Sequence, residues 1–281
     1  MNVAFIAEVS SNHNTDLKRS LALIEKAAEI GCSAVKFQLF KIDELFSPEV
    51  LAARPELRER KKWELPVDFI PPLSQRAREL GLQFGCTPFY LHAVDELKPY
   101  VDFFKIASYE LLWKELLVAC AKTGKPVILS TGMATMDEIA VAHQALVEGG
   151  AREITLLHCT SAYPTPPDQC NLAAIRTLST AFGCHAGWSD HSVSPGVIFR
   201  SIFTYQAEVI EFHFDLEGSG AEFSGGHNWL PQPMKEVIAA VREGFVADGL
   251  GVKGPAPNEL VEREWRADPS DGLRPFKKIR L

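Results

Sequence analysis

The chain has 281 residues, of which 46% are hydrophobic, enough to bury one large core or two small ones. Its formal net charge of -7 and its short basic clusters exclude an extended nucleic-acid surface, although local lysines can still bind a small anion. No apolar run approaches the roughly 20 residues that span a bilayer, and the N-terminus lacks the features of a secretion signal. The six cysteines form no C-x-x-C pair and are expected to be reduced thiols in a cytoplasmic protein.

Short runs rich in Val, Ile and Phe alternate along the chain with longer segments of helical period. The expected strands cover residues 2–9, 34–40, 83–89, 102–108, 126–132, 153–161, 185–191 and 209–216. Helical segments such as "DLKRSLALIEKAAEIG" and "TMDEIAVAHQALVEGG" lie between them, and several end in Gly, which is common just past a helix C-terminus. The last helix is expected at "MKEVIAAVREGFVADG". The pattern predicts eight strand–helix units.

Eight such units in about 250 residues are typical of an α/β protein with a single-domain TIM (β/α)8 barrel. A doubly wound open sheet is the main alternative, because periodicity does not show closure. No G-x-G-x-x-G follows the first strand and no G-x-x-x-x-G-K-[ST] occurs, which excludes the common nucleotide-binding forms of that alternative. We expect the barrel in residues 1–250 and an extended C-terminal tail in residues 251–281. The charged excursion at residues 41–65 is either a lid or a solvated insertion.

Polar side chains gather at the C-terminal ends of the expected strands, where barrels of this type build their active sites. They are Glu8, Lys36, Gln38, Thr87, Lys105, Ser108, Glu110, Ser130, Ser161, Tyr163, Ser189, His191, Glu211 and His213. Each alone has an ordinary explanation, since a single Lys or His on a strand is more often snorkelling or hydrogen-bonded than catalytic. Together they favour a site, because two buried lysines without an anionic partner would be costly.

The last two expected strands each place a histidine at this rim. Strand 209–216 alternates strictly, with aromatic residues on one face and Glu211 and His213 on the other. His191 and His213 come from neighbouring strands, and two imidazoles with nearby carboxylates suit a divalent metal with open positions. No local spacing motif accompanies the pair, so packed histidines remain a competing interpretation. His227 shows no comparable placement by spacing.

The two rim lysines predict an anionic ligand. Lysines act as point charges on phosphate or carboxylate, and hydroxyls donate hydrogen bonds to them. The residues suited to this role are Lys36, Lys105, Thr87, Ser108 and Ser189. The residues left for a polyhydroxylated or amide-bearing partner are Glu8, Gln38, Glu110, Tyr163 and Glu211. The residues alone therefore predict a metal-assisted barrel enzyme acting on an anionic, phosphorylated small molecule, without naming the reaction.

Eight segments resemble, in order, the motifs of the sialic acid synthase family. They are "IAEVSSNHN", "AVKFQLF", "CTPF", "FKIASYE", "ILSTGMAT", "LLHCTSAYPTP", "GWSDHS" and "EFHF", and together they run from residue 5 to about 215. "LHCTSAYP" and "SDH" are the most specific of these segments. The chain is therefore identified as a member of the family that includes the N-acetylneuraminate, pseudaminic acid and legionaminic acid synthases.

The resemblance implies an enzyme, a transferase that condenses phosphoenolpyruvate with an open-chain aldose such as N-acetylmannosamine and releases phosphate by C–O cleavage. It implies a divalent metal, manganese first with magnesium or cobalt as alternatives, that is held by His191 and His213 and polarises the aldehyde oxygen. The residues implied to contact phosphoenolpyruvate are Lys36, Thr87, Lys105, Ser108, Ser161 and Ser189. The implied catalytic residues are Glu8, Glu110 and Glu211, and the further sugar contacts are Gln38 and Tyr163.

Three features depart from the family's pattern. Ser161 stands where members often carry Asn beside the phosphate. Gly226 stands where the loop after the last strand usually has a sugar-binding Asp, and Glu217 and Glu222 are the candidate replacements. The family's C-terminal antifreeze-like domain, which supplies an arginine to a partner's active site, does not follow the barrel in this sequence. Arg274 is the candidate to replace that arginine.

These departures fall on the acceptor side, so we expect phosphoenolpyruvate dependence and leave the acceptor open between N-acetylmannosamine and a related sugar. The expected partners are these small-molecule substrates, with a homodimer or a separate antifreeze-like domain protein as macromolecular partners and no nucleic acid or membrane. Two rival interpretations keep the barrel. One is a metal-dependent lyase or hydrolase, which would not need both lysines; the other is a non-catalytic sugar-binding barrel that needs the separate antifreeze-like partner.

Overall fold

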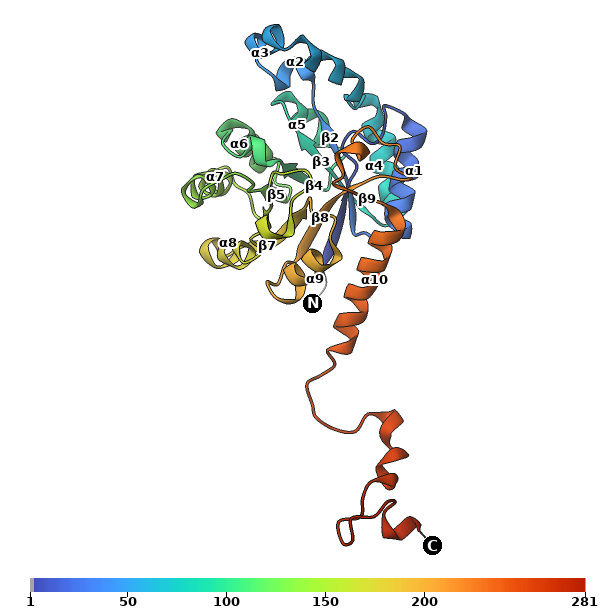
Figure 1. The fold of residues 1–281 in the computed structure, drawn as a ribbon. Coiled ribbons are helices and arrows are strands. Elements are labelled where there is room, and N and C mark those ends of the chain that lie inside the picture. Colours follow the sequence, from blue (N-terminus) through green and yellow to red (C-terminus); the bar gives the residue numbers. More distant parts are fainter. Residues whose placement is uncertain (1–2, 281) are drawn as a thin grey trace. The chain divides into compact units, whose positions relative to one another are not determined.

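The computed structural model describes residues 3–280 and contains a closed parallel β-barrel (Figure 1). Its strands are β1 (Ala4–Glu8), β2 (Ala34–Leu39), β3 (Gln83–Pro88), β4 (Phe103–Ile106), β5 (Val127–Ser130), β6 (Ile154–His158), β7 (His185–Asp190) and β8 (Val209–Phe214). Each strand pairs in parallel with the next one in sequence, and β1 also pairs with β8, so that Phe5 lies opposite Ile210. This last pairing closes the sheet. The predicted TIM (β/α)8 barrel is confirmed and the open sheet is excluded.

Helices surround the strands in Figure 1, as the eight predicted strand–helix units require. The helices that follow β1 to β8 are α1 (Leu17–Glu29), α4 (Ile70–Glu79), α5 (His92–Leu97), α6 (Lys114–Lys122), α7 (Met136–Glu148), α8 (Ala174–Phe182), α9 (Pro195–Phe203) and α10 (Pro231–Ala247). Their inward faces are apolar, as in α1, which buries Leu23 and Ile24. The Asp16 carboxylate caps the start of α1, and Gly183, at a φ of 61°, ends α8.

The observed strands end earlier than the sequence predicts at the rim. Residues 102–108 and 153–161 were the expected ranges, whereas β4 ends at Ile106 and β6 ends at His158. The apolar run continues past β6 because Cys159, already in the loop, is buried. Ser108 and Glu110 consequently lie in the 3-10 turn η3 (Ser108–Glu110), and Ser161 lies in the loop after β6. A ninth strand that the sequence did not indicate, β9 (Asn228–Trp229), pairs with β8.

Apolar side chains fill the barrel below the rim. One buried cluster comprises Ile6, Ala34, Phe103, Ile128 and Leu157, with Val209 packed against it. Gly85 makes room for the Phe103 ring, since a Cβ at this position would lie 2.2 Å from the ring. The barrel therefore has a closed apolar floor, and any polar site on its axis opens at the C-terminal ends of the strands.

The excursion after β2 is helical and rests on an apolar cluster of its own. It contains α2 (Ile42–Leu45), α3 (Pro48–Ala53), η1 (Pro55–Trp63) and η2 (Val67–Phe69). Phe40, Ile42 and Leu51 form the centre of that cluster, and Phe89 from the loop after β3 packs against it. This packing fixes the excursion to the barrel at the end where β2 and β3 finish.

The chain divides into two compact units, residues 1–241 and residues 242–281, with the boundary inside α10. The second unit contains the 3-10 turns η6 (Pro257–Glu259), η7 (Glu262–Trp265) and η8 (Lys277–Ile279). Within it, the Arg280 guanidinium donates to Asp271 and to the Leu273 carbonyl. The assignment of residues 251–281 to an extended tail stays a prediction. Among the described residues, no helix has the length and apolar character needed to cross a membrane.

Candidate active site

A cavity of about 700 Å³ lies at the rim of the barrel, within the size range of small-molecule sites. The predicted site residues that line it are Glu8, Lys36, Gln38, Thr87, Lys105, Ser108, Glu110, Ser130, Tyr163, Ser189, His191, Glu211 and His213. Ser161 is not among the lining residues. Its Oγ is buried without a hydrogen-bond partner, and a Cβ at Gly132 would lie 2.4 Å from it.

The period of the strands explains why so many polar groups share this cavity. Successive side chains of a strand point to opposite faces, so residues two apart share one face. Lys36 therefore stands directly above the floor residue Ala34, and Lys105 stands above Phe103. The register of the strands also places rim residues of neighbouring strands at the same level, since Glu8 is paired with Lys36 on β2 and with His213 on β8. β1, β2, β4, β5 and β8 each contribute an apolar floor residue and, two positions later, a polar rim residue.

The two lysines occupy one side of the cavity and are buried, at 2% and 3% exposure. The Lys36 ammonium contacts the Glu8 carboxylate and donates to Thr87 Oγ1 over 2.9 Å. The Lys105 ammonium donates to Ser130 Oγ over 2.7 Å and lies 3.5 Å from a Glu211 carboxylate oxygen. Both ammonium groups therefore have counter-ions, and both remain at the cavity surface, where a substrate anion can reach them.

The lysines and the acids set one another's charge. Burial opposes ionisation of Glu211, but the ammonium groups of Lys105 and Lys36 outweigh burial and lower its pKa. Burial lowers the pKa of Lys36 to about 8, so this group is still mostly protonated at neutral pH. This side of the cavity therefore holds two cations and an ionised carboxylate, which suits an anionic substrate.

Glu110 differs from the other acids. Burial raises its pKa to about 7, against the opposing effect of Lys105. Its Oε2 is buried and accepts no hydrogen bond, as expected for a carboxyl group that is neutral for much of the time. A carboxyl group that titrates near neutral pH inside a cavity is suited to general acid–base chemistry.

The histidines lie on another side of the cavity. The ring of His191 is 5.4 Å from that of His213 and 4.2 Å from that of Tyr163, measured between centroids. His191 Nδ1 donates to the Thr160 carbonyl over 2.7 Å, which leaves its Nε2 lone pair free. Burial lowers the pKa of His191 to about 3, so the ring is neutral at physiological pH and can ligate a metal. The predicted convergence of His191 and His213 is confirmed; their role as metal ligands stays a prediction.

Spacing alone does not place His227 at the site, and the structure adds it to the cavity lining. The loop after β8 carries His227 into the cavity, where its ring centroid is 4.6 Å from that of His213. The same loop brings in Glu222, whose Oε2 lies 3.6 Å from His213 Nδ1. Glu217, the other candidate, is 56% exposed at its side chain and pairs with Arg19. The available signal was the short string "EFSGGH", in which one acid and one histidine flank glycines.

These groups fit a divalent cation. Ligand atoms of His213, Glu222 and His227 all lie within 4.8 Å of one another, and His213 Nδ1 is buried without a hydrogen-bond partner. Imidazole nitrogens and a carboxylate are ordinary ligands for first-row divalent metals. The donor set thus supports the predicted metal dependence on structural grounds.

The cavity wall also contains an arginine of the charged excursion, which the sequence analysis did not predict as a site residue. Arg60 of η1 lines the cavity, and its guanidinium lies 5.9 Å from the Phe46 ring and 5.5 Å from the Trp63 ring. Its Nε is buried and has no hydrogen-bond partner. Part of the excursion is therefore cavity wall rather than solvated insertion. Arg274 belongs to the second unit, and its predicted role stays a prediction.

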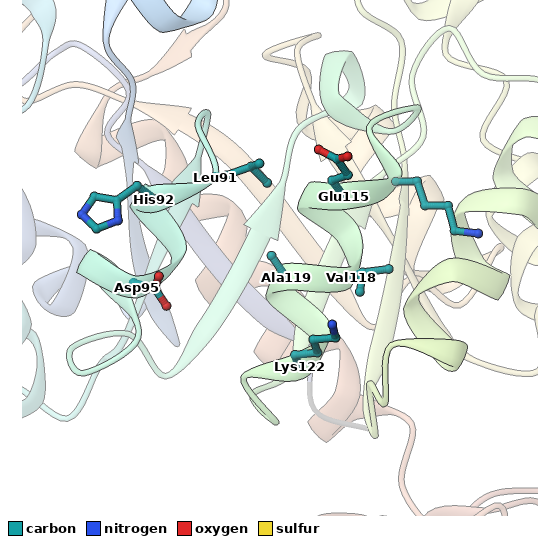
Figure 2. Close-up of a pocket in the computed structure, with 8 residues that line it drawn as sticks. Leu91, His92, Asp95, Glu115, Val118, Ala119 and Lys122 are labelled. Atoms are coloured by element: carbon teal, nitrogen blue, oxygen red, sulfur yellow. The ribbon is translucent and has the colours of Figure 1, made fainter.

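A second hollow lies outside the barrel, between α5 and α6, and is shown in Figure 2. It is lined by Leu91, His92, Asp95, Lys114, Glu115, Val118, Ala119 and Lys122. The residues that line this hollow come from the outer helices, whereas the polar residues at the ends of the strands line the rim cavity. We therefore place the active site at the rim.

A comparison with protein-family models decides between the competing interpretations of what this site does. The model described as the NeuB family matches residues 23–253. The chain belongs to the NeuB family. It is therefore an enzyme, a condensing synthase that uses phosphoenolpyruvate, and the predicted resemblance is confirmed. NeuB enzymes are generally metal-dependent, and the non-catalytic interpretation is set aside.

Individual relatives agree with this assignment to the NeuB family. N,N'-diacetyllegionaminic acid synthase of Campylobacter jejuni is 35% identical over 267 residues, covering 90% of this chain and 80% of that protein. Spore coat polysaccharide biosynthesis protein SpsE of Bacillus subtilis is 31% identical over 275 residues, covering 94% and 73%. The crystal structure of N-acetylneuraminic acid synthetase from Leptospira borgpetersenii matches with a TM-score of 0.82 at 29% identity, covering 96% of this chain and 93% of that one.

Proposed function

We propose that this NeuB enzyme condenses phosphoenolpyruvate with the aldehyde of an open-chain aldose, N-acetylmannosamine or a related sugar, to give a nonulosonic or related 2-keto-3-deoxy sugar acid. C3 of phosphoenolpyruvate forms a bond to the aldehyde carbon, water adds at C2, and phosphate then leaves with cleavage of the C–O bond at C2. The observation that carries the proposal is the pair of buried lysines, Lys36 and Lys105, in the same cavity as His191 and His213. A lyase or hydrolase has no need of two cations at this position.

Phosphoenolpyruvate is assigned to the lysine side of the cavity. Its carboxylate and phosphate together require at least two cationic contacts, which Lys36 and Lys105 supply as point charges. The hydroxyl groups of Thr87, Ser108 and Ser189, which line the cavity, are assigned to the remaining oxygens. The carboxylates of Glu8 and Glu211 contact Lys36 and Lys105, respectively, and balance their charge.

The sugar is assigned to the side formed by Gln38, Glu110 and Tyr163, with Arg60 at its apolar wall. A divalent ion held by His191 and His213, with manganese proposed first, supplies Lewis-acid polarisation of the aldehyde oxygen. Glu110 is assigned the role of giving a proton to the oxygen that becomes a hydroxyl, because its pKa of about 7 keeps a useful fraction protonated at neutral pH. Glu211, whose carboxylate the ammonium groups of Lys105 and Lys36 keep ionised, is assigned the role of orienting the sugar or the water and accepting a proton from that water.

The direct test is release of inorganic phosphate from phosphoenolpyruvate by the purified chain with Mn2+ and a panel of aldoses. We expect release that depends on one class of sugar, together with a product in which the phosphoenolpyruvate carbons have joined the sugar. Phosphate release without an added sugar would identify a phosphatase and overturn the proposal. The absence of release with every sugar, despite bound metal and phosphoenolpyruvate, would also overturn it.

A further inference from the structure

The loop between β8 and β9 crosses the metal side of the cavity and carries two groups suited to metal binding. Glu222 Oε2 lies 3.6 Å from His213 Nδ1 and 4.0 Å from His227 Nε2. These separations are too long for hydrogen bonds. They do match ligand atoms that share an ion, because two ligands each about 2.1 Å from a metal lie roughly 3 to 4 Å apart.

The position of this loop is fixed by residues at the start of the chain. Asn12, which is fully buried, accepts a hydrogen bond from the Glu222 amide over 2.9 Å and donates to the Phe214 carbonyl over 3.0 Å. Asp215 accepts from the Gly218 and Gly220 amides over 2.8 and 3.1 Å. These hydrogen bonds fix the loop to the barrel and therefore hold Glu222 close to His213.

We propose that Glu222 and His227 are direct ligands of the divalent ion and that, with His213, they form a ligand set completed by His191. This inference rests on the proposed function for the presence of the ion, and it adds the two ligands. The unpartnered Nδ1 of His213, which faces Glu222 from inside the protein, is the observation that points to an ion between them.

This ligand set has chemical consequences. An ion bound by three imidazoles and one carboxylate keeps fewer positions for water or substrate than an ion bound by two histidines alone. Imidazole-rich sites favour cobalt, nickel, zinc or manganese over magnesium, which prefers oxygen ligands and its own waters. The carboxylate also cancels one of the two charges of the ion inside a cavity that already contains two lysines. We therefore expect tight retention of a transition metal and weak binding of magnesium.

The test compares metal binding by the metal-stripped full-length chain and its variants, using titration calorimetry with Mn2+ in the absence of substrates. Loss of a direct ligand should exceed the 10- to 100-fold effect typical of an outer-shell change, so we expect Glu222→Gln and His227→Asn to weaken binding by about 100-fold or more. Glu217→Gln is the matched control, because Glu217 lies on the same loop but is exposed and paired with Arg19. It should leave the affinity within about threefold.

A spectroscopic readout separates ligation from loop disruption. The visible absorption of Co2+ reports its ligand set, so both variants should change the spectrum and the Glu217→Gln control should not. Unchanged Mn2+ affinity and an unchanged Co2+ spectrum in Glu222→Gln would overturn the inference. Thermal unfolding of the metal-free variants checks that they fold.

Failure of this inference is distinguishable from failure of the proposed function. If Glu222→Gln binds Mn2+ as the unaltered protein does but loses phosphate release, Glu222 contacts the sugar and the proposed reaction stands. If Glu222→Gln loses the metal while the unaltered protein condenses no sugar, the ligand set stands and the proposed reaction falls.

Discussion

The two sides of the cavity are built in different ways. On the lysine side, Lys36 and Lys105 come from strand interiors and already have protein partners in the structure. On the histidine side, His227 and Glu222 come from a loop, and the Nδ1 atoms of His213 and His227 have no hydrogen-bond partner. One side is prearranged and charge-balanced, whereas the other has unused ligand capacity. The difference suggests that anion binding depends on the barrel, and that metal and acceptor recognition depend on its loops.

The largest effect should come from the prearranged side. Lys105→Met removes one of the two cations on this side of the cavity, so we expect kcat/KM for phosphoenolpyruvate to fall by about 100-fold or more, as for loss of a preorganised charge-stabilising donor. Metal affinity should be retained, because Lys105 belongs to the other side of the cavity. Steady-state phosphate release and Mn2+ titration measure the two quantities.

Lys114→Met is the control for this variant, since Lys114 is exposed on α6 outside the rim cavity. Full activity in Lys105→Met would remove the argument for phosphoenolpyruvate on the lysine side.

The strand-borne side could be predicted from the sequence because a strand's period fixes which way each side chain points. Once the strands at residues 34–40 and 102–108 are recognised, Lys36 and Lys105 must share the rim with the polar residues of neighbouring strands. The exact ends of the strands were harder to predict from the sequence, since buried loop residues such as Cys159 extend the apolar pattern beyond β6.

The loop-borne side could not be predicted in the same way. His227 lies 14 residues beyond His213, and its position depends on hydrogen bonds that the loop backbone amides donate to Asn12 and Asp215. Arg60 likewise reaches the cavity only because the excursion packs on an apolar cluster centred on Phe40. Neither contact produces a periodic pattern in the sequence, because each is a tertiary interaction between segments that are far apart along the chain.

The next largest effect concerns Glu110, which lines the cavity and is assigned to the sugar side. Its raised pKa means that the carboxyl group is protonated below about pH 7 and ionised above it. If Glu110 donates a proton to the new hydroxyl, kcat should decline as pH rises through about 7. Glu110→Gln should lower kcat roughly 10-fold or more below that pH and remove this decline. The measurement is the pH profile of kcat from pH 5.5 to 8.5.

Glu115→Gln is the matched control, because Glu115 is an exposed acid a few residues away on α6. The assignment of Glu110 as the acid fails if Glu110→Gln keeps the same bend in the profile. A rate that increases through pH 7 in the unaltered enzyme would instead make Glu110 a base.

A smaller effect is expected where the excursion meets the cavity. Arg60→Ala removes a guanidinium whose Nε is buried and unpartnered, and a charged hydrogen bond to the sugar is worth roughly a 10-fold change in KM. We expect KM for the sugar to rise by about that factor while KM for phosphoenolpyruvate stays within twofold. Arg54→Ala, in the same excursion but exposed and paired with Glu56, should change neither constant. Equal increases in both KM values would show that Arg60 supports the fold of the excursion and does not select the acceptor.

The smallest effect should come from displacing the β8–β9 loop without removing any ligand. A Cβ at Gly220 would lie 2.3 Å from Asn12 Oδ1 and 2.6 Å from Asp215 Oδ1, so Gly220→Ala must move the loop away from the two groups that hold it. Because Glu222 is two residues further on, we expect Mn2+ affinity to fall by about 10-fold, the lower end of outer-shell effects, with unchanged affinity for phosphoenolpyruvate. Ser219→Ala, an exposed change in the same loop, provides the control. A parallel loss of phosphoenolpyruvate affinity in Gly220→Ala would mean that the two sides of the cavity are coupled. Metal binding and phosphoenolpyruvate binding would then not be separate functions, although the strands build one side and a loop builds the other.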